Sequence, residues 1–314
     1  MKRLAIGVLA LAVWVAGSAL GAIGGTAPAV ARSGIVVGKA HAAYTPSLDG
    51  KDPITILAVG SGARPGEDVL HSLADSLHVI FIDPATHKAS MIGIPRDAYV
   101  PIEGHGTGKI NSSLFLGGPE LLVKTVEQLG GIQIDYWAIT TFWGFTDMID
   151  DVGGLTMNVP FAMSDSYARA DFQPGVQELS GRDALAFART RHDLQQGDFA
   201  RQENGGRLFL AALAQFKKEY KANQAALFTW LGAGMRNTDL TLSLNEVIDL
   251  AQTATYISVA KVQNIVLPGS AQMAGSLSVV MLDVARAKAI FTDAKADAVV
   301  SKKNIPPSPT ADET

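Results

Sequence analysis

The sequence predicts a single α/β domain over residues 51–300. Short apolar runs of strand length alternate along the chain with longer stretches in which apolar residues recur at helical spacing. No internal repeat and no change of composition interrupts this span. With 314 residues, of which 47% are hydrophobic, the chain is long enough to bury one sizeable core.

The first 31 residues predict export. Lys2 and Arg3 precede an uncharged run over residues 4–25, which is longer than the usual core of a signal peptide and long enough to cross a bilayer. Ala29-Val30-Ala31 nevertheless fits the small-residue pattern of a signal-peptidase site. We therefore expect either a single membrane anchor with the domain outside the cell membrane, or a signal peptide cleaved after Ala31 and a secreted domain.

The predicted domain lies between two segments without periodicity. Residues 32–50 carry Gly, Ala, Ser and two His, which predicts a linker. Residues 301–314 are rich in Ser, Lys and Pro, which predicts a disordered tail.

The first half of the domain begins with strands. Residues 54–59 form an apolar run, and the glycine-rich stretch after it, 60–66, is either a phosphate-binding loop or a plain turn. Residues 77–82 and 89–94 predict an antiparallel hairpin. Because Pro95 ends the pairing, Arg96 and Asp97 should project at the strand end, either into a site or as a structural ion pair.

Helices and strands then alternate. Pro119 suits the first position of a helix that ends at Gly130 and Gly131. Five aromatic residues between 136 and 145 are as typical of ordinary core as of a lipid groove. Further strands are predicted over 136–141, 155–159, 264–267 and 278–281, and further helices over 142–149, 208–220, 243–257 and 284–291.

Residues 180–207 hold the main candidate site. Ser180 and Asp183 form a carboxylate variant of the capping box, which predicts a short helix that buries Ala184, Leu185 and Ala188.

Three arginines follow this helix. Arg189 and Arg191 cannot share a helix face, but they share a face where the chain is extended, and Arg201 follows after a turn. Together they predict a phosphate or carboxylate clamp, since a guanidinium group donates two hydrogen bonds to two oxygens. The alternative is a set of surface ion pairs with Asp183, Asp193 and Asp198.

These stretches resemble the motifs of the LytR-CpsA-Psr (LCP) family of cell-envelope proteins. The resemblance is densest over residues 54–213. It is carried by Ile94-Pro95-Arg96-Asp97, Lys109-Ile110-Asn111, Gly117-Gly118, Leu179-Ser180-Gly181, residues 184–191, Gly197-Asp198-Phe199 and Arg201.

The resemblance implies a fold and a reaction. The fold would be a three-layer α/β/α domain with a mixed central sheet and an apolar pocket for a polyprenyl chain. Members of the family are membrane-anchored phosphotransferases that move a glycan from a polyprenyl diphosphate carrier onto peptidoglycan. A peptidoglycan hydroxyl would attack the phosphorus nearer the glycan and expel polyprenyl phosphate.

The resemblance also implies roles for single residues. Asp75, Arg96 and Asp97 would be catalytic, and Asp75 would hold Mg²⁺. The diphosphate would be bound by Arg64, Arg96, Lys109, Arg189, Arg191 and Arg201.

Three positions depart from the family pattern. Gly62 stands where the family has a metal-binding aspartate, Leu73 where an arginine is usual, and Gly205 where a glutamine is usual. These departures leave a second hypothesis open, a catalytically impaired module that binds lipid-linked glycan or a partner transferase. Families of this type are also labelled transcriptional attenuators or regulators.

Composition excludes other classes of function. The formal net charge of −4 argues against a nucleic-acid partner, because a surface that follows phosphates normally makes a domain basic. The chain has no cysteine, which excludes a disulfide framework, a thiolate metal site and a cysteine nucleophile.

Overall fold

The structure, a computed structural model, describes residues 34–41, 53–192, 194, 196–236, 238–240 and 242–311. The segment predicted as a membrane anchor or signal peptide lies outside these residues. Within the described ranges, no helix has the length and apolar character needed to span a membrane.

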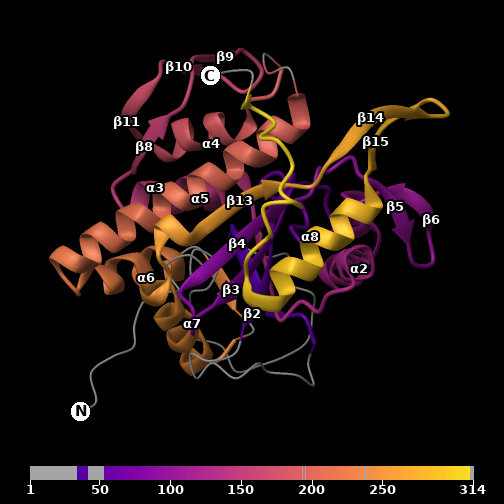
Figure 1. The fold of residues 1–314 in the computed structure, drawn as a ribbon. Helices are drawn as coiled ribbons and strands as arrows, with labels where there is room; N and C mark the ends of the chain where they lie inside the picture. Colours follow the sequence, from indigo (N-terminus) through magenta and orange to yellow (C-terminus); the bar gives the residue numbers. More distant parts are fainter. Residues whose placement is uncertain are drawn as a thin grey trace.

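A seven-stranded mixed sheet forms the centre of the domain (Figure 1). Its strands are β1 (Ile35–Lys39), β2 (Ile54–Ser61), β3 (Ala74–Asp83), β4 (Lys88–Gly93), β7 (Tyr136–Thr140), β12 (Thr238–Leu240) and β13 (Val262–Val266). Their order is β12-β1-β7-β2-β3-β4-β13. The strands β2 and β4 both run antiparallel to β3 between them, whereas β7 lies parallel to β2.

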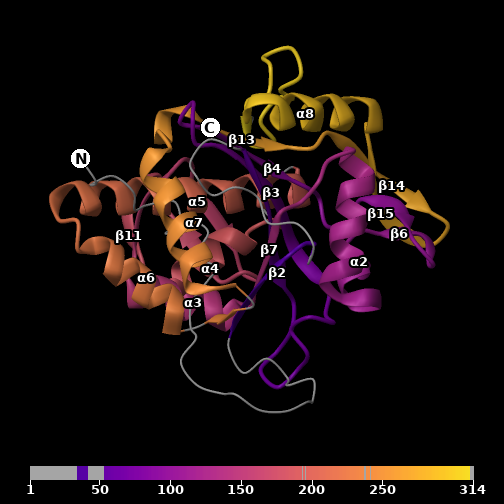
Figure 2. The same ribbon diagram turned by 90° about the horizontal axis from the view of Figure 1, so that it is seen from below.

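Helices cover both faces of the sheet. They are α2 (Ser112–Gly130), α3 (Phe142–Asp151), α4 (Gly181–Arg189), α5 (Gly197–Ala222), α6 (Ala226–Arg236), α7 (Leu244–Tyr256) and α8 (Val284–Asp297). Figure 2 shows α2 and α8 on one side of the sheet and the other helices on the opposite side. The β2 side chains alternate accordingly, with Ile54 and Ile56 facing α3 to α7 and Leu57 and Val59 facing α2 and α8.

Four two-stranded sheets and a short helix complete the fold. The sheets pair β5 (Tyr99–Ile102) with β6 (Gly106–Lys109), β8 (Leu155–Val159) with β11 (Gly175–Leu179), β9 (Met163–Asp165) with β10 (Ala170–Phe172), and β14 (Gly269–Ala274) with β15 (Leu277–Leu282). The 3₁₀ helix η1 covers Val259–Lys261.

The structure confirms the main sequence predictions of the fold. Strands β3 and β4 form the predicted antiparallel hairpin, and the capping boxes at Ser180 and Ser243 open α4 and α7. The helix predicted from Pro119 begins earlier, at Ser112, with non-helical backbone at Gly117 and Gly118. Gly118 has φ of 64°, a conformation that favours glycine.

The predicted linker over residues 32–50 is wrong where it covers Ile35–Lys39. These residues form β1, which pairs with β7 and β12 inside the central sheet. The β-branched run Ile35-Val36-Val37 suits a buried strand, and all three side chains are buried. Gly34 just before it lies against Gly144, so closely that a Cβ on Gly34 would stand 2.4 Å from the Gly144 Cα.

The predicted disordered tail is wrong for residues 301–311, which pack against α8 and α5. Ser301 donates its backbone N–H to Asp293 at 3.0 Å. Thr310 is 1% exposed, and its hydroxyl lies 2.8 Å from Glu203 and 2.6 Å from Arg207. The polar side chains that suggested disorder instead hydrogen-bond to Glu203 and Arg207, which form an ion pair within α5.

Asp135, just before β7, gives the fold a pH dependence. It is 8% exposed and accepts the Thr55 N–H at 2.7 Å. Burial raises the pKa of Asp135 to about 6, although the bond from Thr55 and the nearby His41 lower it in part. Because the folded pKa exceeds the unfolded one, stability is full at pH values below about 4 and falls as the pH rises to about 6.

Replacing Asp135 with asparagine is therefore expected to stabilise the protein at pH 8 by about 2 to 3 kcal/mol. The difference from wild type should shrink to roughly half a kcal/mol near pH 4, where the folded-state aspartate is protonated and the unfolded one is about half protonated. Chemical denaturation of both proteins at the two pH values measures it. An equal difference at pH 4 and pH 8 would contradict a titrating Asp135.

Candidate functional site

A cavity opens at the carboxyl ends of β2 and β7, where the sheet meets α3, α4 and α5. Its volume is about 210 Å³. The strands contribute Ala58 and Gly60 of β2 and Ala138 and Thr140 of β7. The carboxyl edge of an open α/β sheet is a common place for a ligand site.

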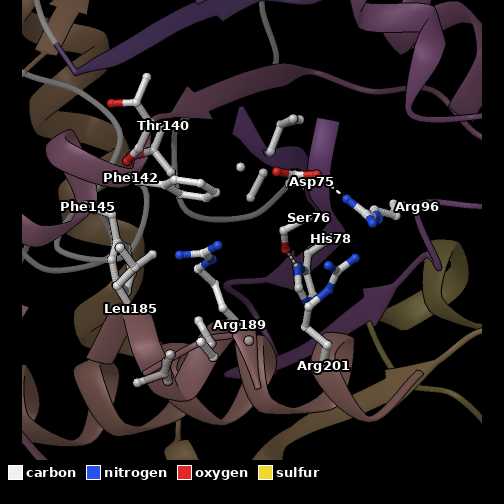
Figure 3. Close-up of a pocket in the computed structure, with 18 of the residues that line it drawn as sticks. Asp75, Ser76, His78, Arg96, Thr140, Phe142, Phe145, Leu185, Arg189 and Arg201 are labelled. Atoms are coloured by element: carbon white, nitrogen blue, oxygen red, sulfur yellow. Dashed lines mark hydrogen bonds and ion pairs between the residues drawn. The ribbon is translucent and has the colours of Figure 1, made fainter. Parts of the chain in front are cut away.

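One side of the cavity is apolar. Figure 3 shows Phe142, Phe145 and Leu185 on this side, across from Asp75, Arg96 and Arg201. The sequence was equally compatible with a lipid groove and with ordinary core for the aromatic residues between 136 and 145. The structure places some of them in the core and others in the cavity lining. Tyr136 is buried in the core, whereas Phe142 and Phe145 line the cavity. Leu185 was expected to be buried by α4, and it instead lines the cavity half-buried.

The other side of the cavity is cationic. Its lining includes Arg96, Arg189, Arg191 and Arg201. Among the described residues that line it, Asp75 is the one carboxylate. The lining therefore presents an excess of positive charge, which suits a ligand with several negative oxygens.

The end of α4 brings Arg189 and Arg191 to the same cavity. Arg189 is the last helical residue, and Thr190 has extended backbone with φ of −59° and ψ of 126°. This break in the helix confirms the prediction that the two arginines share a face. The Arg189 guanidinium also lies 4.8 Å from the centroid of the Phe142 ring, between the two sides of the cavity (Figure 3).

Arg201 reaches the cavity from the first turns of α5 and forms an ion pair with Asp198. The predicted alternative of ion pairs is thus right about this partner but wrong about its surface position, since Arg201 is 9% exposed. Burial raises the pKa of Asp198, and the charges of Arg201 and Arg96 lower it in part.

Arg96 joins Asp198 and Asp75 in one network. Its backbone N–H donates to Asp198 at 3.1 Å, and its guanidinium forms an ion pair with Asp75. The Nε atoms of Arg96 and Arg201 are buried without a hydrogen-bond acceptor among the described residues. Two buried cationic donors therefore have hydrogen-bonding capacity that the surrounding protein does not use.

Three predicted site residues do not line the cavity. Lys109 Nζ lies 3.0 Å from Asp97 Oδ1, so these two charges neutralise each other next to Arg96. Arg64 is exposed, with its guanidinium 5.6 Å from the centroid of the Phe142 ring, which places it at the rim. The structure thus brings together Asp75, Arg96, Arg189, Arg191 and Arg201 of the predicted set.

Ser76 and His78 also line the cavity, although they are not among the predicted site residues. His78 is 1% exposed, and its Nε2 lies 3.0 Å from the Gln202 carbonyl oxygen. Burial lowers the pKa of His78 to about 4, so the ring is neutral at neutral pH. A histidine inside the otherwise apolar run 77–82, two residues after a serine, was the signal available in the sequence.

Gly205 makes room for the His78 ring. A Cβ at position 205 would lie 2.9 Å from His78 Cε1. The His78 ring therefore occupies the space that a larger side chain at position 205, such as the glutamine usual in the family, would need.

The described residues alone do not build a magnesium site. No cluster of three or more His, Asp or Glu side chains with metal-ligand spacing occurs among them. Asp75 is already paired with Arg96, and the Gly62 backbone lies beside it, where a Cβ would stand 2.9 Å from Asp75 Oδ2. Mg²⁺ usually takes one or two protein carboxylates plus phosphate oxygens and water, so magnesium at Asp75 stays a prediction that depends on the substrate's oxygens.

Comparison with known proteins shows the family to which this chain belongs. Residues 31–296 match the model of the LytR_cpsA_psr family. Over 159 residues the chain is 38% identical to the polyisoprenyl-teichoic acid–peptidoglycan teichoic acid transferase TagU of Bacillus subtilis (strain 168). That match covers 50% of each protein, so the chain spans about half the length of this curated relative.

Solved structures share the fold. The crystal structure of B. subtilis TagV superposes with a TM-score of 0.66 at 28% identity, covering 78% of this chain and 98% of that one. The structure of TagT bound to LI-WTA gives a TM-score of 0.65 at 25% identity, covering 79% and 92%. Both confirm a mixed α/β fold around a central mixed sheet.

Proposed function

This chain belongs to the LytR_cpsA_psr family, and from that premise we propose that it is a cell-wall glycopolymer phosphotransferase. It attaches a polyprenyl-diphosphate-linked glycan to peptidoglycan on the outer face of the membrane. The similar protein TagU is named as a polyisoprenyl-teichoic acid–peptidoglycan teichoic acid transferase, and TagT has been solved bound to LI-WTA.

The observation that carries the proposal is the division of the cavity. Among the described lining residues, four arginines and one carboxylate form one side, and aromatic and aliphatic side chains form the other. A polyprenyl diphosphate has the same division between a charged head and an apolar chain. At about 210 Å³ the cavity is smaller than the roughly 300 to 1,000 Å³ of a pocket that encloses a whole ligand. The cavity therefore holds the head and the first isoprenoid units, and the rest of the chain extends outward.

In the proposed reaction the protein positions the reactants and neutralises the charge that develops on the phosphate. The acceptor hydroxyl oxygen forms a bond to the phosphorus nearer the glycan, and the bond from that phosphorus to the oxygen of polyprenyl phosphate breaks. Asp75, held in place by Arg96, receives the hydroxyl proton because it is the one carboxylate of the described lining. Arg96, Arg189, Arg191 and Arg201 neutralise the charge that the leaving phosphate gains.

Asp97 and Lys109 act through Arg96. Asp97 Oδ2 lies 4.0 Å from Arg96 Nε, and Lys109 pairs with Asp97. This pair keeps the Arg96 side chain in one orientation, so both are positioning residues in the proposal.

One observation favours a second candidate function. The described part of the cavity lining offers one carboxylate where a magnesium-dependent transferase of this type is expected to use two. A module that binds lipid-linked glycan without transferring it needs the arginines but not the second carboxylate. The deciding experiment is release of polyprenyl phosphate from a lipid-linked glycan analogue by the purified chain with magnesium present. Binding without release supports the second candidate.

The proposal includes the cellular location. The positive residues before the apolar run over 4–25 stay inside, and the domain lies outside the membrane, tethered or released after Ala31. Its partners there are the lipid-linked glycan, peptidoglycan and the membrane.

Substitution of Arg189 or Arg191 by alanine should weaken binding of a polyprenyl diphosphate analogue by on the order of 1.5 to 3 kcal/mol each, because each loses a charge-assisted hydrogen bond. Isothermal titration with the full chain measures the loss. The matched control is Arg182→Ala, an exposed arginine of the same helix outside the cavity lining. Arg189 and Arg191 variants that bind as well as the Arg182 control would remove both arginines from the diphosphate site.

A further inference from the structure

We propose that Tyr167 and His192 form a saccharide subsite at the rim of the cavity, which binds the first sugar attached to the diphosphate. The inference rests on the proposed function and names the part of the substrate that these two side chains recognise. Neither residue is among those predicted from the sequence to bind the diphosphate.

The two rings form an exposed aromatic surface beside the arginines. Tyr167 is 76% exposed, and its ring centroid lies 4.5 Å from that of His192 with an interplanar angle of 36°. Both residues line the cavity, and His192 directly follows Arg191 in the chain. A group bound to the rings therefore adjoins a phosphate bound to Arg191.

A buried carboxylate holds this surface in place. Asp165 is 2% exposed and accepts the backbone N–H groups of Tyr167 at 2.9 Å, Arg191 at 2.9 Å and His192 at 3.0 Å. It also contacts His192 Nδ1 at 3.1 Å, which leaves Nε2 as the ring nitrogen that can face a ligand. One side chain thus fixes both the turn between β9 and β10 that carries Tyr167 and the chain segment that carries Arg191.

The hydrogen bonds of Asp165 depend on its negative charge, which it keeps at neutral pH. Burial acts to raise the pKa of Asp165, but hydrogen bonds from His192, Arg191 and Ala168 outweigh it and hold the pKa well below its ordinary range. The carboxylate therefore stays ionised at neutral pH. The Tyr167 backbone and the His192 ring are therefore held in place before any ligand arrives, which lowers the entropic cost of binding.

The chemistry of the rim favours a sugar over an alkyl chain. A pyranose ring has an apolar face of C–H groups and an edge of hydroxyl groups. The exposed aromatic faces suit the former, and the Tyr167 hydroxyl and an imidazole nitrogen suit the latter. The alkyl chain has its own place on the apolar side of the cavity, at Phe145, Met148 and Leu185.

The test compares two ligands on the full chain: a polyprenyl diphosphate, and the same lipid carrying one N-acetylhexosamine. Tyr167→Ala is expected to lower affinity for the glycosylated lipid roughly three- to tenfold and to leave affinity for the bare lipid unchanged. Tyr167→Phe keeps the ring and should retain most of the affinity. Phe228→Ala removes another exposed aromatic side chain, outside the cavity lining, and serves as the matched control.

The outcomes separate the subsite from the function on which it rests. Equal affinity of wild type for both lipids, or equal losses for both in Tyr167→Ala, would overturn the subsite and leave the diphosphate site standing. Wild type that binds neither lipid would overturn the proposed function and the subsite with it. Because Tyr167 is largely exposed, its variants should fold, and a melting curve for each verifies this.

Discussion

Replacing Arg201 with methionine is expected to cost on the order of 3 to 5 kcal/mol of folding free energy and most of the affinity for a polyprenyl diphosphate. Arg201 is 9% exposed and is the ion-pair partner of Asp198, whose side chain is 12% exposed. Methionine keeps the packing of the aliphatic stem but leaves the Asp198 carboxylate with Arg96 alone. There it has the Arg96 backbone N–H at 3.1 Å and the Arg96 Nε at 4.0 Å.

A double variant separates the loss of folding stability from the loss of diphosphate affinity. Arg201→Met with Asp198→Asn removes the uncompensated charge, so it should recover much of the stability while diphosphate affinity stays low. The single variant should also lose less stability at pH 5 than at pH 8. The pKa of Asp198 is already raised by burial, and without Arg201 it rises further, so the folded state takes up a proton as the pH falls. Denaturation and lipid titration measure both effects, and a single variant as stable as the double one would show that Asp198 does not need Arg201.

Gly62→Asp combined with Leu73→Arg is expected to raise magnesium affinity and polymer transfer at least tenfold, a change of about 1.4 kcal/mol or more. Position 62 is not among the glycines with positive φ, so an aspartate meets no backbone strain there. Its Cβ would stand 2.9 Å from Asp75 Oδ2, which flexible side chains can relieve by a small shift. Two adjoining carboxylates repel each other until a cation binds between them. Leu73 is 46% exposed, so an arginine fits there without repacking the core.

A thermal readout supports the activity assay. The double variant should melt lower than wild type without magnesium and gain stability as magnesium is added, because the ion binds the folded state. Gly62→Asn with Leu73→Arg has nearly the same size without the charge, and it should show neither effect. Wild type that already transfers polymer as fast as the double variant would show that Gly62 and Leu73 do not mark a weakened site. A folded double variant that binds magnesium but transfers nothing would favour the binding module.

The sequence predicted the parts of the site that local patterns determine. The capping box at Ser180 and the spacing of Arg189 and Arg191 are local features, and the structure places both arginines on one cavity as expected. Pro95 likewise placed Arg96 at the end of β4.

The missed features depend on contacts between residues far apart in the chain. Asp165 holds the segment around His192, which lies 27 residues away, and its partners are mostly backbone N–H groups that leave no trace in side-chain identity. Lys109 and Asp97 were predicted as site residues, but in the structure they form an ion pair with each other outside the cavity lining. The strand β1 and residues 301–311 find their partners in β7 and α5, which no local composition could indicate.

On the anchor interpretation, the position of β1 would limit how far the cavity stands from the membrane. Gly34 precedes this strand, and its carbonyl oxygen accepts the Thr141 backbone N–H at 2.7 Å and the Thr141 hydroxyl at 2.8 Å, at the edge of the cavity. On the anchor interpretation, residues 26–33 are the whole tether, and at roughly 3.5 Å per residue they reach at most about 28 Å. That reach is no more than the thickness of the hydrocarbon layer itself, about 30 Å. If the chain is anchored, a carrier lipid would keep most of its chain in the bilayer while its head is bound, so binding would not require the lipid to leave the bilayer.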